Sequence, residues 1–443
     1  MNVFRQFADW LGRVLEPRPM QRSLPAPVPG AALAPAVPFQ AAAPAPAKPA
    51  RSRRAIMHEV FDTGMPVANR AGLAGRTDEL ERLLEAVLDH RKHGIIYGAR
   101  GSGKTSLSRI FGDMADERGC LVLYNLASGD IAFSDLFRPY LLDIAAEPQS
   151  KVRRSEVEAL LNEPFDARRL ASLLADRVER RTILMLDEFD RVHSLETKAE
   201  LAALMKLLSD MRSEVSIVTI GIAANLEDLI AGHPSLRRHL IAVPVGGLTP
   251  TDLDALLRRC LTRVDLDITD DAAAMIVSAA VGSPYHLRLF GLYAALQADI
   301  AGKSVIDHDV AVRGLEVAFA EWRDVSRRNA DLLLSQIDRP RTLALPAAII
   351  CLNAAMRSRV DRGEVIAELD EPNAAEQVDA MLATLGPILV ESSTSGQYVF
   401  EDSLAPQFFL LLFTRKIASG GAERGLGAGH DLRALLQDKG ATQ

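Results

Sequence analysis

The stretch "IIYGARGSGKTSLSRI", residues 95–110, decides the fold of this 443-residue chain. It reads as a short apolar run, a glycine-rich bend with a lysine, and a helical pattern. The spacing G-x-x-x-x-G-K-[ST] is matched by Gly98, Gly103, Lys104 and Thr105. Strand, loop and helix are the context in which this spacing binds phosphate, whereas a plain Gly/Ser turn requires neither flank. The stretch therefore predicts a phosphate-binding loop.

The residue types of this loop follow from the chemistry of an anion site. Glycine allows the positive φ angles that turn backbone N–H groups inward, and the next helix points the positive end of its dipole at the anion. Lys104 is expected to reach the β- and γ-phosphates, and the Thr105 hydroxyl group to ligate Mg²⁺. The expected cofactor-binding residues of the loop are Gly98, Gly101, Ser102, Gly103, Lys104, Thr105 and Ser106.

A second motif, "ILMLDEFD" at residues 183–190, is an apolar strand that ends in acidic residues. Asp187 is expected to hold the Mg²⁺ shell and Glu188 to polarise the attacking water, because phosphoryl transfer depends on charge neutralisation and placement. A carboxylate cluster at a strand end can instead cap a helix. The upstream phosphate loop favours a Mg²⁺-dependent ATPase, with ATP and Mg²⁺ as cofactors, and a slow rate of hydrolysis is compatible with it.

The core is expected to be an α/β P-loop NTPase fold with a mainly parallel five-stranded sheet. Near-continuous Val/Ile/Leu runs indicate strands that are covered on both faces, as in parallel sheets. The strand candidates are residues 94–97, 120–127, 182–187, 215–223 and 239–245.

Composition indicates a globular protein of the cytoplasm. The net charge is −7 and the pI is near 5.8, so no global charge excess points to nucleic acid. The three cysteines are odd in number and widely spaced, which speaks against a disulfide framework or a metal site. No stretch predicts a transmembrane segment, and the most apolar one, residues 343–356, predicts a core helix.

Residues 70–300 resemble AAA+-related ATPases, in particular the signal-transduction ATPases with numerous domains (STAND) and the origin-recognition-like ATPases. "LAGRTDELERL", residues 73–83, resembles the box before the phosphate loop in those families, carried by Gly75, Arg76 and Glu79. The resemblance implies that Arg76 belongs to the cofactor-binding residues. It also implies ATP-dependent homo-oligomers.

Four further positions take their roles from the same resemblance. Asn225 stands where sensor 1 contacts the γ-phosphate or water, and Arg237 or Arg238 where an arginine finger reaches a neighbouring subunit. Pro284 would pack near the adenine and Arg288 would act as sensor 2. Each also has a plain structural alternative: a turn-forming Asn, solvated arginines, and a proline in the first turn of a helix.

The predicted organisation has six segments, which differ in composition and pattern. They are an amphipathic helix (1–16), a Pro/Ala-rich linker (17–55), the ATPase core (68–247), a helical lid (248–302), a connecting helix with a winged-helix-like α+β domain (303–416) and a flexible tail (417–443). The first helix is expected to dock on a protein partner or on the chain itself, to make peripheral membrane contact, or to have no ordered role.

The C-terminal segment leaves two functions open. Strands around "SSTSGQ" predict a hairpin, but the preceding helix, residues 373–386, has no Lys or Arg for DNA phosphates. The arginines of residues 356–362 are the remaining candidates for a phosphate-facing patch. The first function is an ATP-driven switch that couples nucleotide state to assembly or partner binding. The alternative is an ATP-dependent DNA-binding protein of origin-recognition type.

Overall fold

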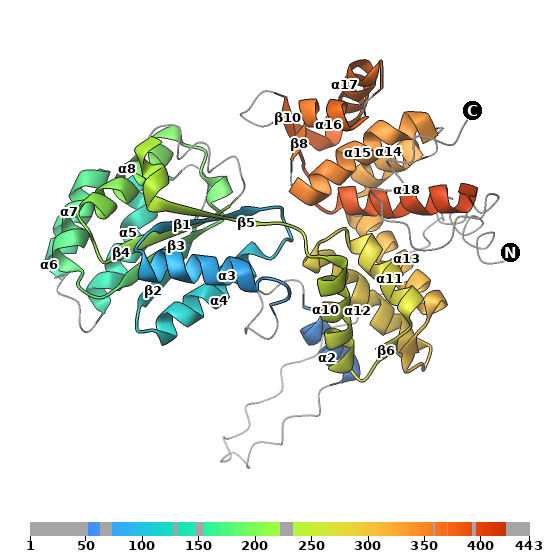
Figure 1. Ribbon diagram of the computed structural model, residues 1–443, viewed down its shortest axis with the longest axis horizontal. Coiled ribbons are helices and arrows are strands. Elements are labelled where there is room, and N and C mark those ends of the chain that lie inside the picture. The colour runs from blue at the N-terminus through green and yellow to red at the C-terminus, as the bar shows by residue number, and fades with distance from the viewer. Residues whose placement is uncertain are drawn as a thin grey trace, which may run out of the picture.

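The computed structural model describes most of the chain from Ser52 onward. The described residues are 52–62, 73–127, 129, 131–147, 154–221, 234–337, 339, 341–357, 359–369, 371–391 and 396–421. The predicted amphipathic helix (1–16), Asn225 and most of the Pro/Ala-rich linker lie outside them. A sheet-containing part and a helical part stand side by side (Figure 1).

The sheet has five parallel strands in the order β2-β3-β4-β1-β5. The strands are β1 (His93–Gly98), β2 (Leu121–Leu126), β3 (Thr182–Asp187), β4 (Val215–Gly221) and β5 (Leu240–Val245). Each begins and ends within a few residues of the prediction, which confirms the α/β fold class. Because all five are parallel, their carboxyl ends meet at one edge of the sheet.

Helices cover both faces of this sheet (Figure 1). In β1, Ile95 faces a core built with α5, α7 and α8, whereas Ile96 faces a core built with α3 and α4. The surrounding elements are α3 (Thr77–Leu84), the π-helical turn η2 (Glu85–Asp89), α4 (Lys104–Glu117), α5 (Phe133–Ala146), α6 (Arg154–Leu161), α7 (Ala167–Arg177), the 3₁₀ turn η3 (Phe189–Arg191), α8 (Leu195–Asp210) and the 3₁₀ turn η4 (Pro234–His239).

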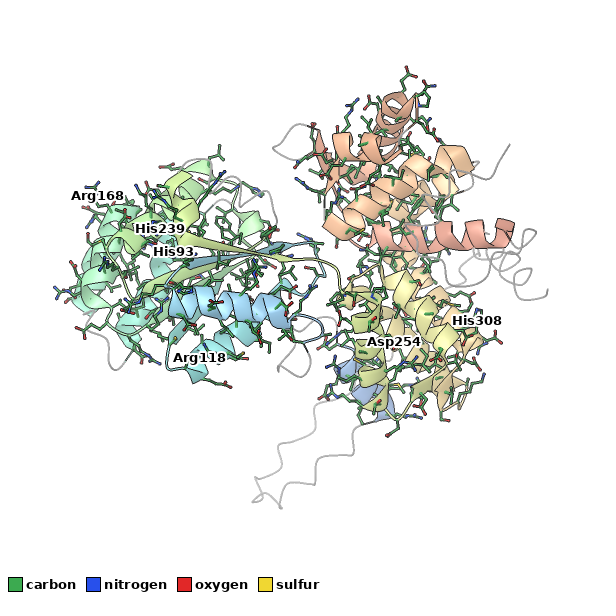
Figure 2. The ribbon with its side chains drawn as sticks, viewed as in Figure 1. His93, Arg118, Arg168, His239, Asp254 and His308 are labelled. Atoms are coloured by element: carbon green, nitrogen blue, oxygen red, sulfur yellow. The ribbon has the colours of Figure 1, made fainter. Side chains whose placement is uncertain are left out.

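His93, at the start of β1, is a structural histidine (Figure 2). Its Nδ1 accepts from the backbone N–H of Ile217 at 2.9 Å, so the proton is on Nε2, which lies 2.7 Å from the carbonyl oxygen of Met205. Burial lowers the pKa of His93 to about 4. The ring therefore ties β1 to its neighbours as a neutral group.

The helical region predicted as a lid follows β5, and it also includes a helix that precedes the sheet in the sequence. Its elements are α10 (Pro250–Thr262), β6 (Asp267–Ile268), α11 (Asp270–Ala280), α12 (Pro284–Ile300), β7 (Val305–Ile306) and α13 (His308–Val325). Against α12 packs α2 (Arg53–Val60), with Met57, Val60 and Phe61 buried. The linker predicted to reach residue 55 was therefore too long: helix formation begins at Arg53 because this apolar face joins the lid core.

The C-terminal region consists of helices with a small sheet. Its elements are α14 (Arg327–Ile337), α15 (Arg341–Arg357), β8 (Val360–Asp361), α16 (Arg362–Leu369), α17 (Ala374–Leu385), the 3₁₀ turn η5 (Gly386–Ile388), β9 (Leu389–Glu391), β10 (Gln397–Phe400) and α18 (Ala405–Gly421). The sheet order is β8-β10-β9, and β9 and β10 form the predicted antiparallel pair. Helix α18 continues to Gly421, so the predicted tail begins too early, because the buried run before residue 414 propagates the helix.

Two further expectations concern helices of this region. The apolar stretch 343–356 lies in α15, where Ala347, Ile350 and Cys351 are fully buried, so the predicted core helix is confirmed. The connecting helix expected at the start of segment 303–416 is two helices, α13 and α14, which meet at Ser326. Among the described residues, no helix combines the length and the apolar composition needed to cross a membrane.

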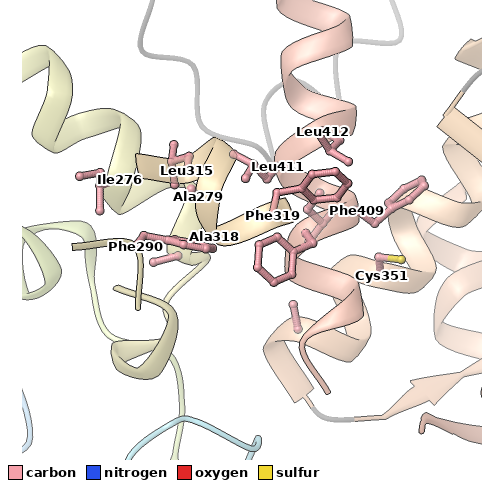
Figure 3. Close-up of a cluster of buried hydrophobic side chains, with 14 of the residues drawn as sticks. Ile276, Ala279, Phe290, Leu315, Ala318, Phe319, Cys351, Phe409, Leu411 and Leu412 are labelled. Carbon is pink, nitrogen blue, oxygen red and sulfur yellow. The ribbon is translucent and has the colours of Figure 1, made fainter. Parts of the chain in front are cut away.

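The lid and the C-terminal region share one hydrophobic core, which runs from Met57 to Phe413. Figure 3 shows Phe290 of α12, Phe319 of α13 and Phe409 of α18 in this cluster. Phe408 stacks on Trp322 at 4.7 Å between ring centroids and meets Phe290 edge-on at 5.7 Å. The two regions are therefore joined by continuous side-chain packing.

Candidate nucleotide-binding site

The predicted phosphate loop joins β1 to α4 with the backbone that an anion site requires. Gly101 and Gly103 have φ angles of +73° and +95°. At Gly98 a Cβ atom would lie 2.1 Å from the carbonyl oxygen of Val245, its register partner in β5. Ser102 is buried, and its Oγ has no hydrogen-bond partner among the described residues. Such a loop, with a free hydroxyl group, fits a ligand rich in oxygen atoms.

Lys104 begins α4 and lies inside the loop. Its Nζ donates to the carbonyl oxygens of Gly98 and Ala99, each at 2.9 Å. An ammonium group has three donors, so one is left for an anion. Burial lowers the pKa of Lys104, while the carboxylates of Asp190 and Asp187 raise it. The cation is thus aimed into the site. Thr105 and Ser106 follow in the first turn of α4.

The acidic end of β3 lies next to this cation. Asp187 is 3% exposed, and its Oδ1 accepts from the backbone N–H of Glu188 at 2.7 Å. The side chain of Glu188 is 41% exposed and pairs with Arg191 at 3.0 Å. The backbone of Glu188 is left-handed, with φ of +55°. A buried and an accessible carboxylate therefore stand in sequence at one strand end.

The box before the loop connects the loop to the lid. Arg76 is 6% exposed and pairs with Glu79 at 2.9 Å. Its guanidinium group also donates to the carbonyl oxygens of Ser102 and Gly246. Gly75 has φ of +56° and lies against Asp252 of α10. Arg76 thus ties the box, the phosphate loop and the segment after β5 together by backbone contacts.

The first turn of α12 contacts the phosphate loop. Ser283 Oγ donates to the Gly101 carbonyl oxygen at 3.3 Å. A Cβ atom on Gly101 would lie 3.1 Å from Tyr285 Cβ, and one on Gly103 3.9 Å from Pro284 Cγ. Pro284, expected among the cofactor-binding residues, therefore lies at the phosphate loop. Ser283 and Tyr285, for which no role was predicted, lie there as well.

Arg288, expected to act as sensor 2, contacts a different part of the chain. Its Nη1 donates at 3.3 Å to the carbonyl oxygen of Asp62, just after α2. The helix places Ser283 and Tyr285, rather than this arginine, against the phosphate loop. Ser283 carries a local signal of its own, because a serine before a proline is typical of a helix start.

The expected finger residues, Arg237 and Arg238, lie on η4 before β5, and both are exposed. Within the described part of the chain, neither side chain forms a hydrogen bond or an ion pair. Asn225, expected at the end of β4, lies outside the described residues. The site as described therefore unites the phosphate loop, Asp187 and Glu188, while the arginines stand on the surface.

A pocket of about 440 Å³ extends from the phosphate loop toward the C-terminal region. Arg100 and Gly101 line it from the loop, Tyr285 and His286 from α12, and residues 401–404 from the segment between β10 and α18. Asp402 accepts from Trp322 Nε1 at 2.7 Å and from Ser326 Oγ at 2.6 Å, which fixes this segment to α13. Nothing in residues 400–406, "FEDSLAP", predicted that this segment lies near the phosphate loop.

Comparison with known proteins finds a family-model match over part of the chain. Residues 85–230 match the family model described as an AAA domain. No curated protein sequence matches the chain.

Three solved structures are similar to the chain. A Walker-type ATPase of Pyrococcus abyssi is 20% identical over 79% of this chain and 99% of that chain, with a TM-score of 0.47. ORC1 of Aeropyrum pernix, in complex with DNA, is 17% identical over 84% of this chain and 100% of that chain, with a TM-score of 0.43. The RuvB Holliday junction branch migration motor of Thermotoga maritima is 17% identical over 75% of this chain and 94% of that chain, with a TM-score of 0.41. The matched residues 85–230 include both the phosphate loop and the acidic end of β3, so the similarity to the AAA domain falls on the part of the chain that carries the candidate site.

Proposed function

We propose that the chain is a Mg²⁺-dependent ATPase that works as a molecular switch, in which bound nucleotide sets the position of the lid together with the C-terminal region. The observation that carries this proposal is the contact of Ser283 with the Gly101 carbonyl group, because the lid that makes it shares its core with the C-terminal region. Nucleotide bound in the phosphate loop would alter this contact, and with it the position of the lid and of the C-terminal region.

In this proposal the residues of the site divide the work. The loop N–H groups and Lys104 bind the phosphates, and Thr105 with Asp187 would hold Mg²⁺. When bound, the metal ion neutralises phosphate charge. Glu188 orients and polarises the attacking water, and its pairing with Arg191 keeps the carboxylate at the mouth of the site. The Ser102 hydroxyl group, buried and without a described partner, supplies a further donor.

The exposed positions of Arg237 and Arg238 support a finger that acts on a neighbouring subunit. A guanidinium group supplied in trans links hydrolysis to assembly, because charge on the γ-phosphate is stabilised only at the subunit interface. We therefore propose that the ATP-bound protein is a homo-oligomer and that a protein partner reads the C-terminal region.

The arginines of the C-terminal region favour a protein partner over DNA. Arg357 pairs with Glu364 and Glu368, and Arg359 pairs with Glu364 at 3.6 Å. Each of these arginines already pairs with a carboxylate of the chain, so its charge is less available to the phosphates of DNA.

Helix α17 adds to this. Arg362 forms a two-pronged ion pair with Asp379 of α17, at 2.6 and 2.7 Å. The element order α15-β8-α16-α17-β9-β10 suits a winged-helix-like domain, but α17, its recognition helix, carries acids and no Lys or Arg. DNA binding of origin-recognition type remains the alternative, and a steep negative salt slope of binding to plain duplex DNA would favour it.

Light scattering after size exclusion tests the switch directly. The protein is run without nucleotide, with ADP and with a non-hydrolysable ATP analogue. The switch predicts a larger species, or a changed hydrodynamic radius, only with the ATP analogue. Identical profiles in all three conditions, with nucleotide binding established by calorimetry, would leave an ATPase without a switch.

A further inference from the structure

Tyr124 of β2 contacts two parts of the candidate nucleotide site, the acidic end of β3 and the helix α4, which are far apart in the sequence. Its hydroxyl group donates to Oδ2 of Asp187 on the neighbouring strand β3. The other oxygen, Oδ1, accepts from the Glu188 N–H. Asp187 is thus held at both oxygens, and its rotation is fixed. An ionised carboxylate has about four lone-pair sites, so each oxygen keeps one for a further partner.

The phenol ring is in turn held by the helix that carries the phosphate-binding residues. Arg109 Cζ lies 4.6 Å from the centroid of the Tyr124 ring. Arg109 belongs to α4, which begins at Lys104 and Thr105. A guanidinium group over an aromatic face is an attractive contact. Arg109, Tyr124 and Asp187 therefore form a chain from the phosphate-binding helix to the acidic strand end.

We propose that Tyr124 is a positioning residue of the metal–nucleotide site: its hydroxyl group fixes the Asp187 carboxylate in the orientation that meets Mg²⁺ and its water shell. The inference rests on the proposed nucleotide site and adds a residue to it. Partners that orient a metal-binding carboxylate typically contribute about ten- to a hundredfold to metal affinity. Loss of the hydroxyl group is therefore expected to weaken the response to Mg²⁺ more than the binding of nucleotide alone.

The chain offers a matched control in Tyr140 of α5. Its hydroxyl group also donates to β3, but to the backbone carbonyl oxygen of Met185, from the opposite face of the sheet. Tyr124→Phe and Tyr140→Phe each remove one hydroxyl group bonded to the same strand. Only the first removes a contact with Asp187.

The experiment titrates Mg²⁺ against the full-length protein and a fluorescent ADP analogue, starting in EDTA. Tyr124→Phe is expected to raise the half-saturating Mg²⁺ concentration about tenfold, with metal-free affinity within about twofold of wild type. Tyr140→Phe is expected to lower the melting temperature without moving the Mg²⁺ midpoint. In an Asp187→Asn background, Tyr124→Phe should add nothing, because the carboxylate it orients is gone.

Three results would overturn the proposal. An unchanged Mg²⁺ midpoint in Tyr124→Phe with a lower melting temperature would make the hydroxyl group purely structural. An equal loss of metal-free affinity would indicate general distortion of the site. A wild-type protein that binds no nucleotide would remove the proposed function first, and the inference with it.

A second variant covers the case in which Tyr124→Phe does not fold. Arg109→Leu releases the ring and leaves the hydroxyl group in place, so a smaller shift of the Mg²⁺ midpoint in the same direction is expected. A midpoint identical to wild type in Arg109→Leu would contradict the chain of contacts.

Discussion

Ser283 and Gly101 are 182 positions apart in the sequence, yet the hydroxyl group of the first donates to the carbonyl oxygen of the second at 3.3 Å. The contact brings the first turn of a lid helix onto the phosphate loop. The lid core continues into α18, so packed side chains connect this helix to the C-terminal region. The predictions below test the loop, the strand end, the surface arginines and the packing that supports them.

Lys104→Ala is expected to lower ATP affinity by at least about a hundredfold, because it removes the cation aimed into the loop. The fold should persist, since the hydrogen bonds of Lys104 within the described residues go to two carbonyl groups of the loop. Calorimetry of ATP binding measures the effect, and Lys206→Ala on α8 is the control for loss of one lysine. ATP affinity at wild-type strength in Lys104→Ala would refute the phosphate-loop assignment.

Glu188→Gln separates binding from turnover. The amide keeps the size of the side chain and leaves Asp187 in place, but it cannot polarise water, so hydrolysis is expected to fall by about 10² to 10⁴ while ATP still binds. Steady-state phosphate release is the measurement. Glu196→Gln, an exposed position in the first turn of α8, is the matched control. Equal turnover in both variants would show that Glu188 is not the catalytic carboxylate.

The finger hypothesis predicts that the ATPase rate per subunit rises with protein concentration. Mixing Glu188→Gln subunits with Arg237→Ala/Arg238→Ala subunits should restore part of the activity, because a mixed interface can join an intact Glu188 to intact arginines. A rate that is flat with concentration, together with no rescue on mixing, would assign these arginines to the solvated surface and the protein to a monomeric switch.

Gly98→Ala is expected to damage both the sheet and the loop. The added methyl group would lie 2.1 Å from the Val245 carbonyl oxygen, and neither strand backbone can withdraw without breaking the β1–β5 ladder. Overpacking of this kind costs about 1–3 kcal/mol, which is a melting temperature several degrees lower. Gly246→Ala is the control, because nothing lies within 4 Å of its added Cβ. Equal melting temperatures for the two variants would contradict the close approach.

Two deletions define the N-terminal boundary of the folded body. Removal of residues 1–50 leaves α2 intact, so core stability and ATP binding should stay close to wild type. Removal of residues 1–62 takes Met57, Val60 and Phe61 out of the lid core and should expose it. Phe61→Ala alone is expected to cost about 3–5 kcal/mol, since the ring packs on the backbone at Gly291. Thermal melts of the three proteins give the answer; a stable 1–62 deletion would show that α2 is dispensable.

Sequence alone was sufficient for the sheet, and it supplied the motifs from which the centre of the candidate site is predicted. The residues 98–105 and the acids after residue 186 are recognisable because phosphate and metal chemistry dictate residue type at fixed local spacing, and the buried strands because both their faces must be apolar. These signals lie within a few residues of one another, so no knowledge of packing is needed to read them.

Tertiary structure decided what lies around that centre. Tyr124 reaches Asp187 only because β2 and β3 are neighbours in the sheet. Residues 53–60, of which only the first three were assigned to the linker, form a helix because their apolar face packs on α12. Arg288 donates to the carbonyl oxygen of Asp62, and Arg362 to the carboxylate of Asp379, because packing brings these acceptors next to them from other elements. A side chain's partner depends on which surfaces pack together, and local spacing carries no record of that choice.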